Sequence, residues 1–214
     1  MKSFDLIPDE SKIETLFIME SPYHEELDSG TPCVGETGKR MSKTILNEDF
    51  LSFGDLLKEN NSKVLEFGIM NSFPFPLEII DNLNDNQLLY KELKKLTWIK
   101  GTTNRDEFYK EHFNLLGDVE ILEQQTGFKQ RITQYFQQCP NLKNLVFCGF
   151  ISQSVYLRLF NQSVISYNKL ISKKTQTGKE INLLFVNHPS KRNLVWDFKI
   201  EILKKTNVKP PTKK

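Results

Sequence analysis

The chain has 214 residues, of which 38% are hydrophobic and 16 are Phe. This length and composition suit one globular domain, which buries enough apolar surface to fold without disulfides or a structural metal. The 29 basic and 27 acidic side chains leave a net charge of +2. Such a balance lacks the strong basic excess of many nucleic-acid-binding proteins, so any phosphate contact must come from local clusters of Lys and Arg.

The cysteines and the hydropathy pattern bear on location. Cys33, Cys139 and Cys148 form no CxxC pair and no spacing typical of zinc or iron–sulfur ligands. Three scattered cysteines fit a reducing compartment. No early apolar stretch has the pattern of a signal peptide, and no run of about 18 apolar residues predicts a membrane span. We therefore expect a cytoplasmic protein, monomeric and without a membrane partner.

The first third of the chain predicts one strand and one helix. Residues 1–11 are polar and predict a loose lead-in, whereas the apolar run 16–19 predicts a buried strand. Several Pro and Gly residues within 20–38 exclude a continuous helix or strand there. The pattern then predicts a helix that opens near Gly38 and buries Met41, Ile45 and Leu46.

The rest of the chain alternates strands and helices. Apolar runs at 64–70 and 145–149 predict strands, and the first of them leads into Asn71. Residues 164–187 predict a hairpin that turns at Thr177 and Gly178. Helices are predicted at 86–138, at 151–160 and at 193–205, and residues 206–214 predict a loose tail. Within 86–138, helical spacing is seen at Ile121, Phe128, Ile132 and Phe136.

Short apolar strands separated by helices predict a three-layer α/β/α domain over residues 1–214, with a central, mostly parallel four-stranded sheet. In such sheets, ligands bind beyond the carboxyl ends of the strands. Polar segments that contain Pro follow three of the predicted strands, at 20–24, at Asn71 and at His188. If the strands are parallel, these three segments meet at one edge of the sheet.

Two of the three histidines, His24 and His188, lie just after predicted strands in loops that contain Pro. A lone His is more often a surface or structural residue than a catalytic one. Placement on a loop at a strand end favours a functional role. His112, in a polar stretch with helical spacing, serves as the comparison without such placement.

Three segments resemble motifs of the uracil-DNA glycosylase superfamily. Residues 18–24 and 30–38 resemble its first motif, with the gap-free spacing of the iron–sulfur branch and the Pro-Tyr-His of the common bacterial and viral branch. Residues 188–193, His-Pro-Ser-Lys-Arg-Asn, resemble the second motif in a form closest to the single-strand-selective monofunctional branch. Residues 70–74, Met-Asn-Ser-Phe-Pro, resemble the strand-end Asn segment between those motifs.

The resemblance implies a DNA repair enzyme that hydrolyses the N-glycosidic bond of uracil or a related deaminated base, with DNA as its partner. His188 would donate a hydrogen bond to the departing base, and Asn71 would read the base edge. Glu20 would activate water, with Ser21 as a weak helper. Tyr23 would exclude a 5-methyl group.

The same resemblance implies residues that touch the base and the DNA backbone. Cys33 stands where the family has a Phe that stacks on the base, and either Phe73 or Phe75 would be its substitute. The backbone from Gly35 to Lys39 would bind a phosphate at a helix N-terminus. The loop that enters the duplex would comprise Ser190, Lys191, Arg192 and Asn193.

Departures from the family pattern leave alternatives open. Active relatives usually have Asp or Asn where Ser21 stands, and the cluster cysteines of the iron–sulfur branch are missing, so we expect no cofactor and no metal. No Lys replaces a motif residue, which favours a monofunctional hydrolase over a lyase. A weak or inactive relative that only binds a nucleobase or damaged DNA is the second reading. A third is an α/β hydrolase or nucleotide-binding protein of another type, although GxGxxG, P-loop and GxSxG motifs are absent.

Each of these roles also has a plain structural alternative. His188 and Ser190 could cap a helix, and Asn71 could be a turn residue before Pro74. Tyr23 and Cys33 could be packing residues. The basic residues at 39–43 and 191–192 could belong to a solvated surface.

Overall fold

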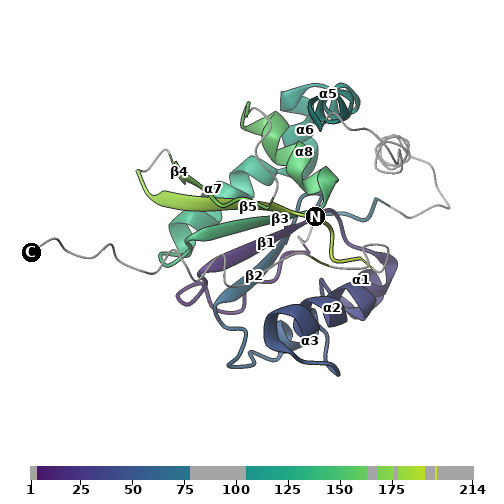
Figure 1. Ribbon diagram of the computed structural model, residues 1–214, viewed down its shortest axis with the longest axis vertical. Coiled ribbons are helices and arrows are strands. Elements are labelled where there is room, and N and C mark those ends of the chain that lie inside the picture. Colours follow the sequence, from purple (N-terminus) through teal and green to yellow (C-terminus); the bar gives the residue numbers. More distant parts are fainter. Residues whose placement is uncertain (1–3, 78–104, 163–167, 176–177, 191–195, 197–214) are drawn as a thin grey trace, which may run out of the picture.

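The structure, a computed structural model, describes residues 4–77, 105–162, 168–175, 178–190 and 196. Within these residues, the centre is a five-stranded sheet in the order β2-β1-β3-β5-β4 (Figure 1). The strands are β1 (Thr15–Met19), β2 (Phe67–Asn71), β3 (Asn144–Cys148), β4 (Ile171–Lys174) and β5 (Glu180–Val186).

Four of the five strands are parallel. β1 pairs in parallel with both β2 and β3, and β3 pairs in parallel with β5. The register sets Met19 opposite Asn71 and Cys148 opposite Val186, so these strands end level with one another. β4 runs antiparallel to β5 and completes the predicted hairpin, whose Thr177 lies outside the described residues.

Helices cover both faces of the sheet (Figure 1). On one face lie α1 (His24–Ser29), α2 (Gly35–Leu46) and α3 (Phe53–Lys58). On the other lie α5 (Arg105–Leu116), α6 (Val119–Thr126), α7 (Phe128–Gln138) and α8 (Phe150–Leu159). The predicted α/β class and mostly parallel sheet are therefore confirmed, and this arrangement is compatible with three layers.

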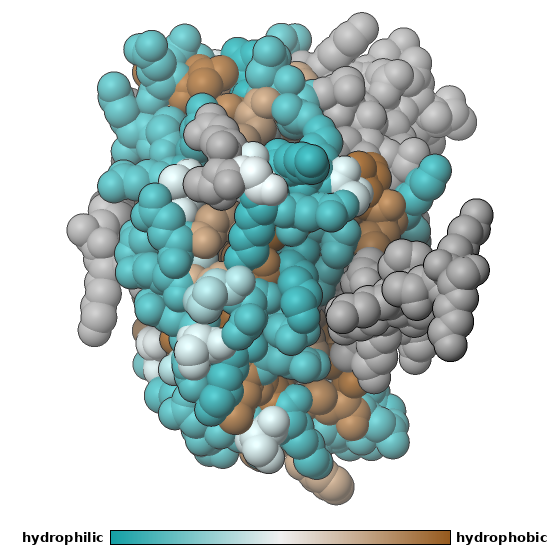
Figure 2. All heavy atoms as spheres, turned by 90° about the vertical axis from the view of Figure 1, so that its left-hand side faces the viewer, coloured by the Kyte–Doolittle hydropathy of each residue, from teal (hydrophilic) through white to brown (hydrophobic). Residues whose placement is uncertain are grey.

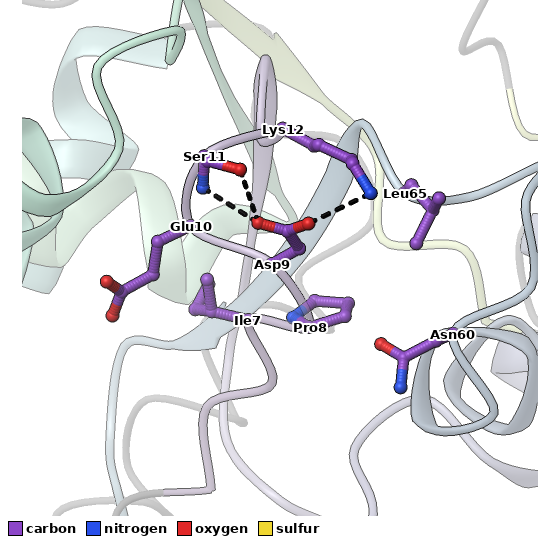
Figure 3. A pocket seen from close by; sticks show the side chains of 8 residues that line it. All are labelled: Ile7, Pro8, Asp9, Glu10, Ser11, Lys12, Asn60 and Leu65. Carbon is purple, nitrogen blue, oxygen red and sulfur yellow. Dashed lines mark hydrogen bonds and ion pairs between the residues drawn. The ribbon is translucent and has the colours of Figure 1, made fainter.

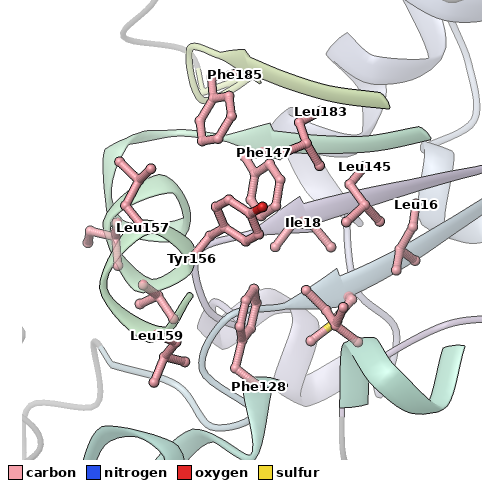
Figure 4. Close-up of a cluster of buried hydrophobic side chains, with 14 of the residues drawn as sticks. Leu16, Ile18, Phe128, Leu145, Phe147, Tyr156, Leu157, Leu159, Leu183 and Phe185 are labelled. Atoms are coloured by element: carbon pink, nitrogen blue, oxygen red, sulfur yellow. The ribbon is translucent and has the colours of Figure 1, made fainter. Parts of the chain in front are cut away.

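Two apolar clusters hold the layers together, because successive side chains of a strand point to opposite faces. Leu16 and Ile18 of β1 belong to the cluster under α6, α7 and α8, whereas Phe17 and Met19 belong to the cluster under α2 and α3. Figure 4 shows the first cluster, where the Phe147 ring lies between Tyr156 and Phe185, at centroid distances of 4.5 and 4.9 Å.

The prediction of four strands is wrong by one. The fifth strand, β4, alternates between half-buried and exposed residues and carries Ser and Lys side chains, so it gives no apolar run. An antiparallel edge strand is buried on one face at most, which explains this weak signal. β2 also begins later than predicted, at Phe67, because the turn that closes at Val64 precedes it.

The predicted loose lead-in is also wrong for residues from Phe4 onward. Leu6 forms an antiparallel bridge with Ile69 on the free edge of β2. The side chain of Asp5 is only 2% exposed and forms an ion pair with Arg131 of α7. A polar segment can thus be fixed by one bridge and one ion pair, which a hydropathy pattern does not reveal.

The helix predictions are correct in part. α2 buries Met41 and Ile45 as expected, but it begins at Gly35 instead of Gly38, and the short helix α1 interrupts the irregular 20–38 segment. Phe128 and Ile132 are buried as predicted, whereas Ile121 is 55% exposed on the outer side of α6. Residues 86–104, most of 193–205 and the tail 206–214 lie outside the described residues.

The face seen in Figure 2 is mostly hydrophilic, with small hydrophobic areas that are separate from one another. Among the described helices, none is both long enough and apolar enough to cross a membrane.

Candidate functional site

The three predicted segments meet at the carboxyl edge of the sheet, as expected from parallel strands. Glu20 directly follows β1, Asn71 is the last residue of β2, and His188 is the second residue after β5. The Phe73 amide donates to the Glu20 carbonyl at 3.0 Å, which joins the β1 and β2 ends. The order β2-β1-β3-β5 then sets Asn71 and His188 three strand spacings apart, roughly 14 Å at the backbone.

Gly149 brings Glu20 and His188 together. It follows β3, which lies between β1 and β5, and it adopts φ +93° just before α8. A Cβ at this position would overlap the Glu20 carboxylate and lie 3.1 Å from the His188 Cβ. Both residues approach the space that a side chain at Gly149 would fill, so Glu20 and His188 are neighbours on the same side of the sheet edge.

The Glu20 carboxylate lies at the N-terminus of α8. The Ile151 amide, in the first turn of that helix, donates to Glu20 Oε1 at 3.3 Å. A helix N-terminus carries partial positive charge and unpaired N–H groups, both of which favour a carboxylate in its charged form. The Glu20 carboxylate is therefore held in one position at the sheet edge, where it can accept a hydrogen bond from water.

The His188 segment is held at its base by two side chains from other elements. Gln153 of α8 donates from Nε2 to the Val186 carbonyl at 2.8 Å. The hydroxyl of Tyr109 donates in turn to Oε1 of Gln153. The indole of Trp196 donates to the Asn187 carbonyl at 2.9 Å. The backbone that leads into His188 is thereby fixed relative to α8.

Asn71 is buried, and its side chain is already engaged. Its Nδ2 donates to the Phe4 carbonyl at 3.0 Å, and its backbone N–H donates to Asp5 Oδ1 at 3.1 Å. Arg131 donates to the Asn71 carbonyl at 2.7 Å. The predicted base-reading amide therefore has a defined orientation, set by the N-terminal segment.

Two of the predicted base-contacting side chains lie in the core. Cys33 is 1% exposed and belongs to the cluster that contains Met19, Cys148 and Val186, the last residues of three strands. Burial raises the pKa of the Cys33 thiol well above its usual range. Phe73 is also 1% exposed and packs edge-on against Phe75 at 5.8 Å. In this conformation both residues pack beneath the sheet edge and present no free face.

Glu26 organises the loop that contains Tyr23 and Cys33. Its carboxylate accepts from the Tyr23 amide at 2.7 Å and from the Cys33 amide. Burial raises the pKa of Glu26 to about 7, although both hydrogen bonds favour the charged form and limit the rise. Tyr23 itself is 45% exposed at the start of α1.

The predicted phosphate site at the start of α2 already holds an anion. A Cβ at Gly35 would overlap the carboxylate of Glu25, so that carboxylate lies at the helix N-terminus. A phosphate there would meet a negative charge instead of free N–H groups. The backbone contact predicted for Gly35 to Lys39 would therefore require the Glu25 side chain to move, whereas the side chain of Lys39 is exposed.

A basic stretch of α2 adjoins the His188 segment. Arg40 Nη1 donates to the Ser190 carbonyl at 2.9 Å, across 150 positions of sequence. Lys39 lies one residue before Arg40 and is exposed. Of the predicted DNA-contacting residues, Lys191, Arg192 and Asn193 lie outside the described residues. Ser190, which precedes them in the sequence, lies beside α2.

Comparison with known proteins gives no family. No protein-family model matches this chain, and no curated protein matches it.

Several residues of the site were not predicted from the sequence. Gly149 and Ile151 follow a strand with no polar motif, and Asp5 and Arg131 are 126 residues apart. A glycine between a buried strand and a helix is one usable signal, since such a position often allows close approach of another group. The Asp5–Arg131 pair had no local signal.

His112 is a core residue and does not belong to the site. It is fully buried on α5, and its Nδ1 lies 2.7 Å from Ser154 Oγ of α8. Burial lowers the pKa of His112 to about 4, which keeps the ring neutral at physiological pH.

A hollow lies at the opposite edge of the sheet, before β1 and β2 begin. Figure 3 shows Asp9 between Ser11 and Lys12, with Asn60 across the hollow. The Asp9 carboxylate accepts from Ser11 Oγ at 2.6 Å and pairs with Lys12 at 3.0 Å. These groups satisfy one another, so the hollow offers less chemistry than the carboxyl edge.

Proposed function

We propose that this chain is a monofunctional DNA glycosylase with a uracil-DNA-glycosylase-like fold, which hydrolyses the N-glycosidic bond of uracil or a related deaminated base in DNA. The proposal combines the motif resemblance with the arrangement at the carboxyl edge of the sheet. The observation that carries it is the approach of Glu20 and His188 to the same glycine, Gly149. It sets the Glu20 carboxylate beside the Cβ from which the His188 imidazole extends.

The chemistry of the reaction needs those two groups. As the bond between C1′ and the base nitrogen breaks, its electron pair leaves with the base, and the sugar becomes positively charged. Glu20 stabilises that charge and accepts a proton from the water that attacks C1′. His188 donates a hydrogen bond to the base oxygen that gains negative charge. The base later takes a proton from solvent.

The remaining residues bind and orient the DNA. Asn71 reads the edge of the flipped base, and Tyr23 forms the wall that excludes a 5-methyl group. Arg40 contacts Ser190, which precedes Lys191, Arg192 and Asn193 in the sequence, and Lys39 is the exposed residue before Arg40. Basic side chains in such a place would contact backbone phosphates.

The test is a base-release assay on oligonucleotides that carry uracil, hypoxanthine, xanthine or hydroxymethyluracil, in single and double strands. We expect alkali-labile abasic sites with at least one of them, and none with the unmodified oligonucleotide. His188→Ala should lower the rate about 10²–10³-fold while the protein stays folded. Intact strands after alkali treatment at high concentrations of folded protein would refute the proposal.

A nucleobase-binding protein without turnover is the second candidate. Ser21 favours it, because active relatives usually have Asp or Asn at that position, and the buried Cys33 offers no stacking face that would orient a base for cleavage. A lost base stack weakens binding by about 1–3 kcal/mol. Submicromolar binding of a uracil-containing strand without base release would select this candidate.

A further inference from the structure

Gln153 is a fully buried amide near the start of α8, with 0% exposure. Burying an amide costs free energy unless its polar atoms form hydrogen bonds. Nε2 of Gln153 donates to the carbonyls of Phe147 and Val186 at 3.3 and 2.8 Å. Its Oε1 accepts from the Tyr109 hydroxyl at the other end of the amide. A carbonyl oxygen can only accept, so these partners allow one orientation of the Gln153 amide.

The Val186 carbonyl lies where β5 ends and the path to His188 begins. It accepts the Gln153 hydrogen bond on the peptide group that joins Val186 to Asn187. The next carbonyl along the chain, that of Asn187, accepts from the indole of Trp196 at 2.9 Å. The two peptide groups that precede His188 are therefore each held by a buried side chain. Rotation of either peptide group would displace the imidazole.

The same turn of α8 holds Glu20. The Ile151 amide, two residues before Gln153, donates to Glu20 Oε1 at 3.3 Å. One short stretch of helix thus contacts the carboxylate through a backbone N–H and the end of β5 through a side chain. Because a helix is rigid over so few residues, the separation of Glu20 and His188 depends on how Gln153 reaches the Val186 carbonyl.

The fold has other supports at this point. β3 and β5 pair along five residue pairs, and side chains of both strands fill the two apolar clusters. The Gly149 amide also donates to the Val186 carbonyl at 2.9 Å. Losing the side-chain donor should therefore shift the end of β5 without separating the strands. A displacement of about 1 Å can lower a reaction rate about 10²-fold, so chemistry responds to such a shift more than folding does.

Resting on the proposed function, we propose that Gln153 is a positioning residue for base release. It sets the distance between the His188 imidazole and the Glu20 carboxylate, and Tyr109 supports it by holding the amide oxygen. Because Gln153 is fully buried, it acts without contacting DNA. Its effect on the reaction therefore requires the imidazole of His188.

A double-mutant cycle tests this dependence. Gln153→Met keeps an unbranched side chain of similar length but loses the amide, and it is measured in the wild type and in His188→Ala. Ser154→Ala is the matched control, because Ser154 is the next residue of α8, equally buried, and contacts His112 and the Phe150 carbonyl. Each protein is assayed for single-turnover base release. Binding is measured with an oligonucleotide that carries 2′-fluorouridine, because fluorine opposes positive charge on the sugar and prevents base loss.

We expect Gln153→Met to slow base release at least about tenfold, with affinity for the fluorinated oligonucleotide within about threefold of the wild type. In the His188→Ala background the same substitution should change the rate by less than about twofold, since no imidazole is left to misplace. Ser154→Ala should leave the rate within about twofold in both backgrounds. An equal loss from Gln153→Met in both backgrounds, or no loss in the wild type, would overturn the inference.

NMR of the imidazole C–H signals tests the same claim without turnover. The chain has three histidines, and His188→Ala identifies the signal of His188. Gln153→Met should shift or split this signal, whereas Ser154→Ala should shift the signal of His112 and leave that of His188 in place. A wild type that releases no base would refute the proposed function alone. An unchanged His188 signal in Gln153→Met would overturn the inference in either case.

If Gln153→Met does not fold, Tyr109→Phe applies the same cycle through the other end of the amide. It removes the hydroxyl that donates to Gln153 Oε1 and keeps the ring. We expect a loss of about threefold in base release that disappears in the His188→Ala background. No loss, or a loss that persists in that background, would overturn the inference.

Discussion

The Ile151 amide donates a hydrogen bond of 3.3 Å to Glu20 Oε1, which ties the end of β1 to the first turn of α8. α8 begins directly after Gly149, so the same carboxylate that the helix holds also lies against the glycine and, through it, beside His188. One strand end, one helix start and one loop are thereby fixed relative to one another.

Gly149→Ala should damage the site more than the fold. Gly149 and Gly178 both have strongly positive φ, at +93° and +82°, so Ala at either position is strained by about 1–2 kcal/mol. Only at Gly149 would the new Cβ overlap Glu20, whereas nothing lies within 4 Å at Gly178. We expect Gly149→Ala to lower the rate of base release more than tenfold and Gly178→Ala to leave it unchanged.

The measurement pairs thermal unfolding with single-turnover base release. Similar losses of stability with unequal losses of activity would support the geometry. Equal activities in the two glycine variants would contradict it.

Glu26 should make the protein less stable as the pH rises toward neutrality. Burial raises its pKa from 4.5 to about 7, so the folded state holds a proton that the unfolded state releases above pH 4.5. Its contribution is fully present below pH 4.5 and is lost as the pH rises through about 7. The difference in unfolding free energy between wild type and Glu26→Gln should therefore fall over this range, by at most about 3 kcal/mol.

Urea unfolding of both proteins at several pH values from 4.5 to 7.5 measures this difference. A difference that stays constant or grows with pH would show that Glu26 titrates normally.

His112 should act in the opposite direction. Burial lowers its pKa from 6.5 to about 4, so the unfolded state binds a proton in this range while the folded state does not. The stability it contributes is present above pH 6.5 and is lost as the pH falls through about 4. His112→Asn keeps a polar partner for Ser154 Oγ but cannot titrate, so its unfolding free energy should depend less on pH between 4 and 6.5.

Equilibrium unfolding of His112→Asn and wild type at matched pH values checks the sign. The slopes, and not the absolute stabilities, are compared, because the substitution also changes packing on α5. Parallel curves would mean that His112 binds protons equally in the folded and unfolded states, so that burial does not lower its pKa.

Arg40→Ala should weaken DNA binding without unfolding the protein. Arg40 donates to the Ser190 carbonyl at 2.9 Å and adds a positive charge beside Ser190. We expect a loss of affinity of about tenfold and a salt dependence that is shallower by about one phosphate contact. Lys63→Ala, an exposed residue that precedes β2, is the control.

Fluorescence anisotropy at several salt concentrations gives both quantities for the two variants. If Arg40→Ala binds with the wild-type salt slope, Arg40 has a local structural role only.

How far the sequence predicts this molecule depends on the range of each interaction. The apolar runs that became β1, β2, β3 and β5 are local signals, and parallel strands then require Glu20, Asn71 and His188 to share one edge. That part of the site followed from hydropathy and topology alone.

The parts that were not predicted arise from contacts between distant residues. Cys33 is buried because the carbonyl of the preceding Pro32 and its own carbonyl lie where Cβ atoms at Gly54 and Gly38 would be. Arg131 meets Asp5 across 126 positions, and Glu25 fills the helix start that a phosphate was expected to occupy. No local pattern encodes such approaches, so only the packed structure reveals them.

Single-turnover release of uracil from DNA by wild type, Glu20→Gln and Glu10→Gln tests the central claim most directly. Glu20 lies at the carboxyl edge beside Gly149, whereas Glu10 is an exposed residue in the hollow at the opposite edge. We predict release by the wild type, a loss of at least about 10²-fold in Glu20→Gln and the wild-type rate in Glu10→Gln. Equal rates for wild type and Glu20→Gln, or no release by folded wild type, would contradict the account.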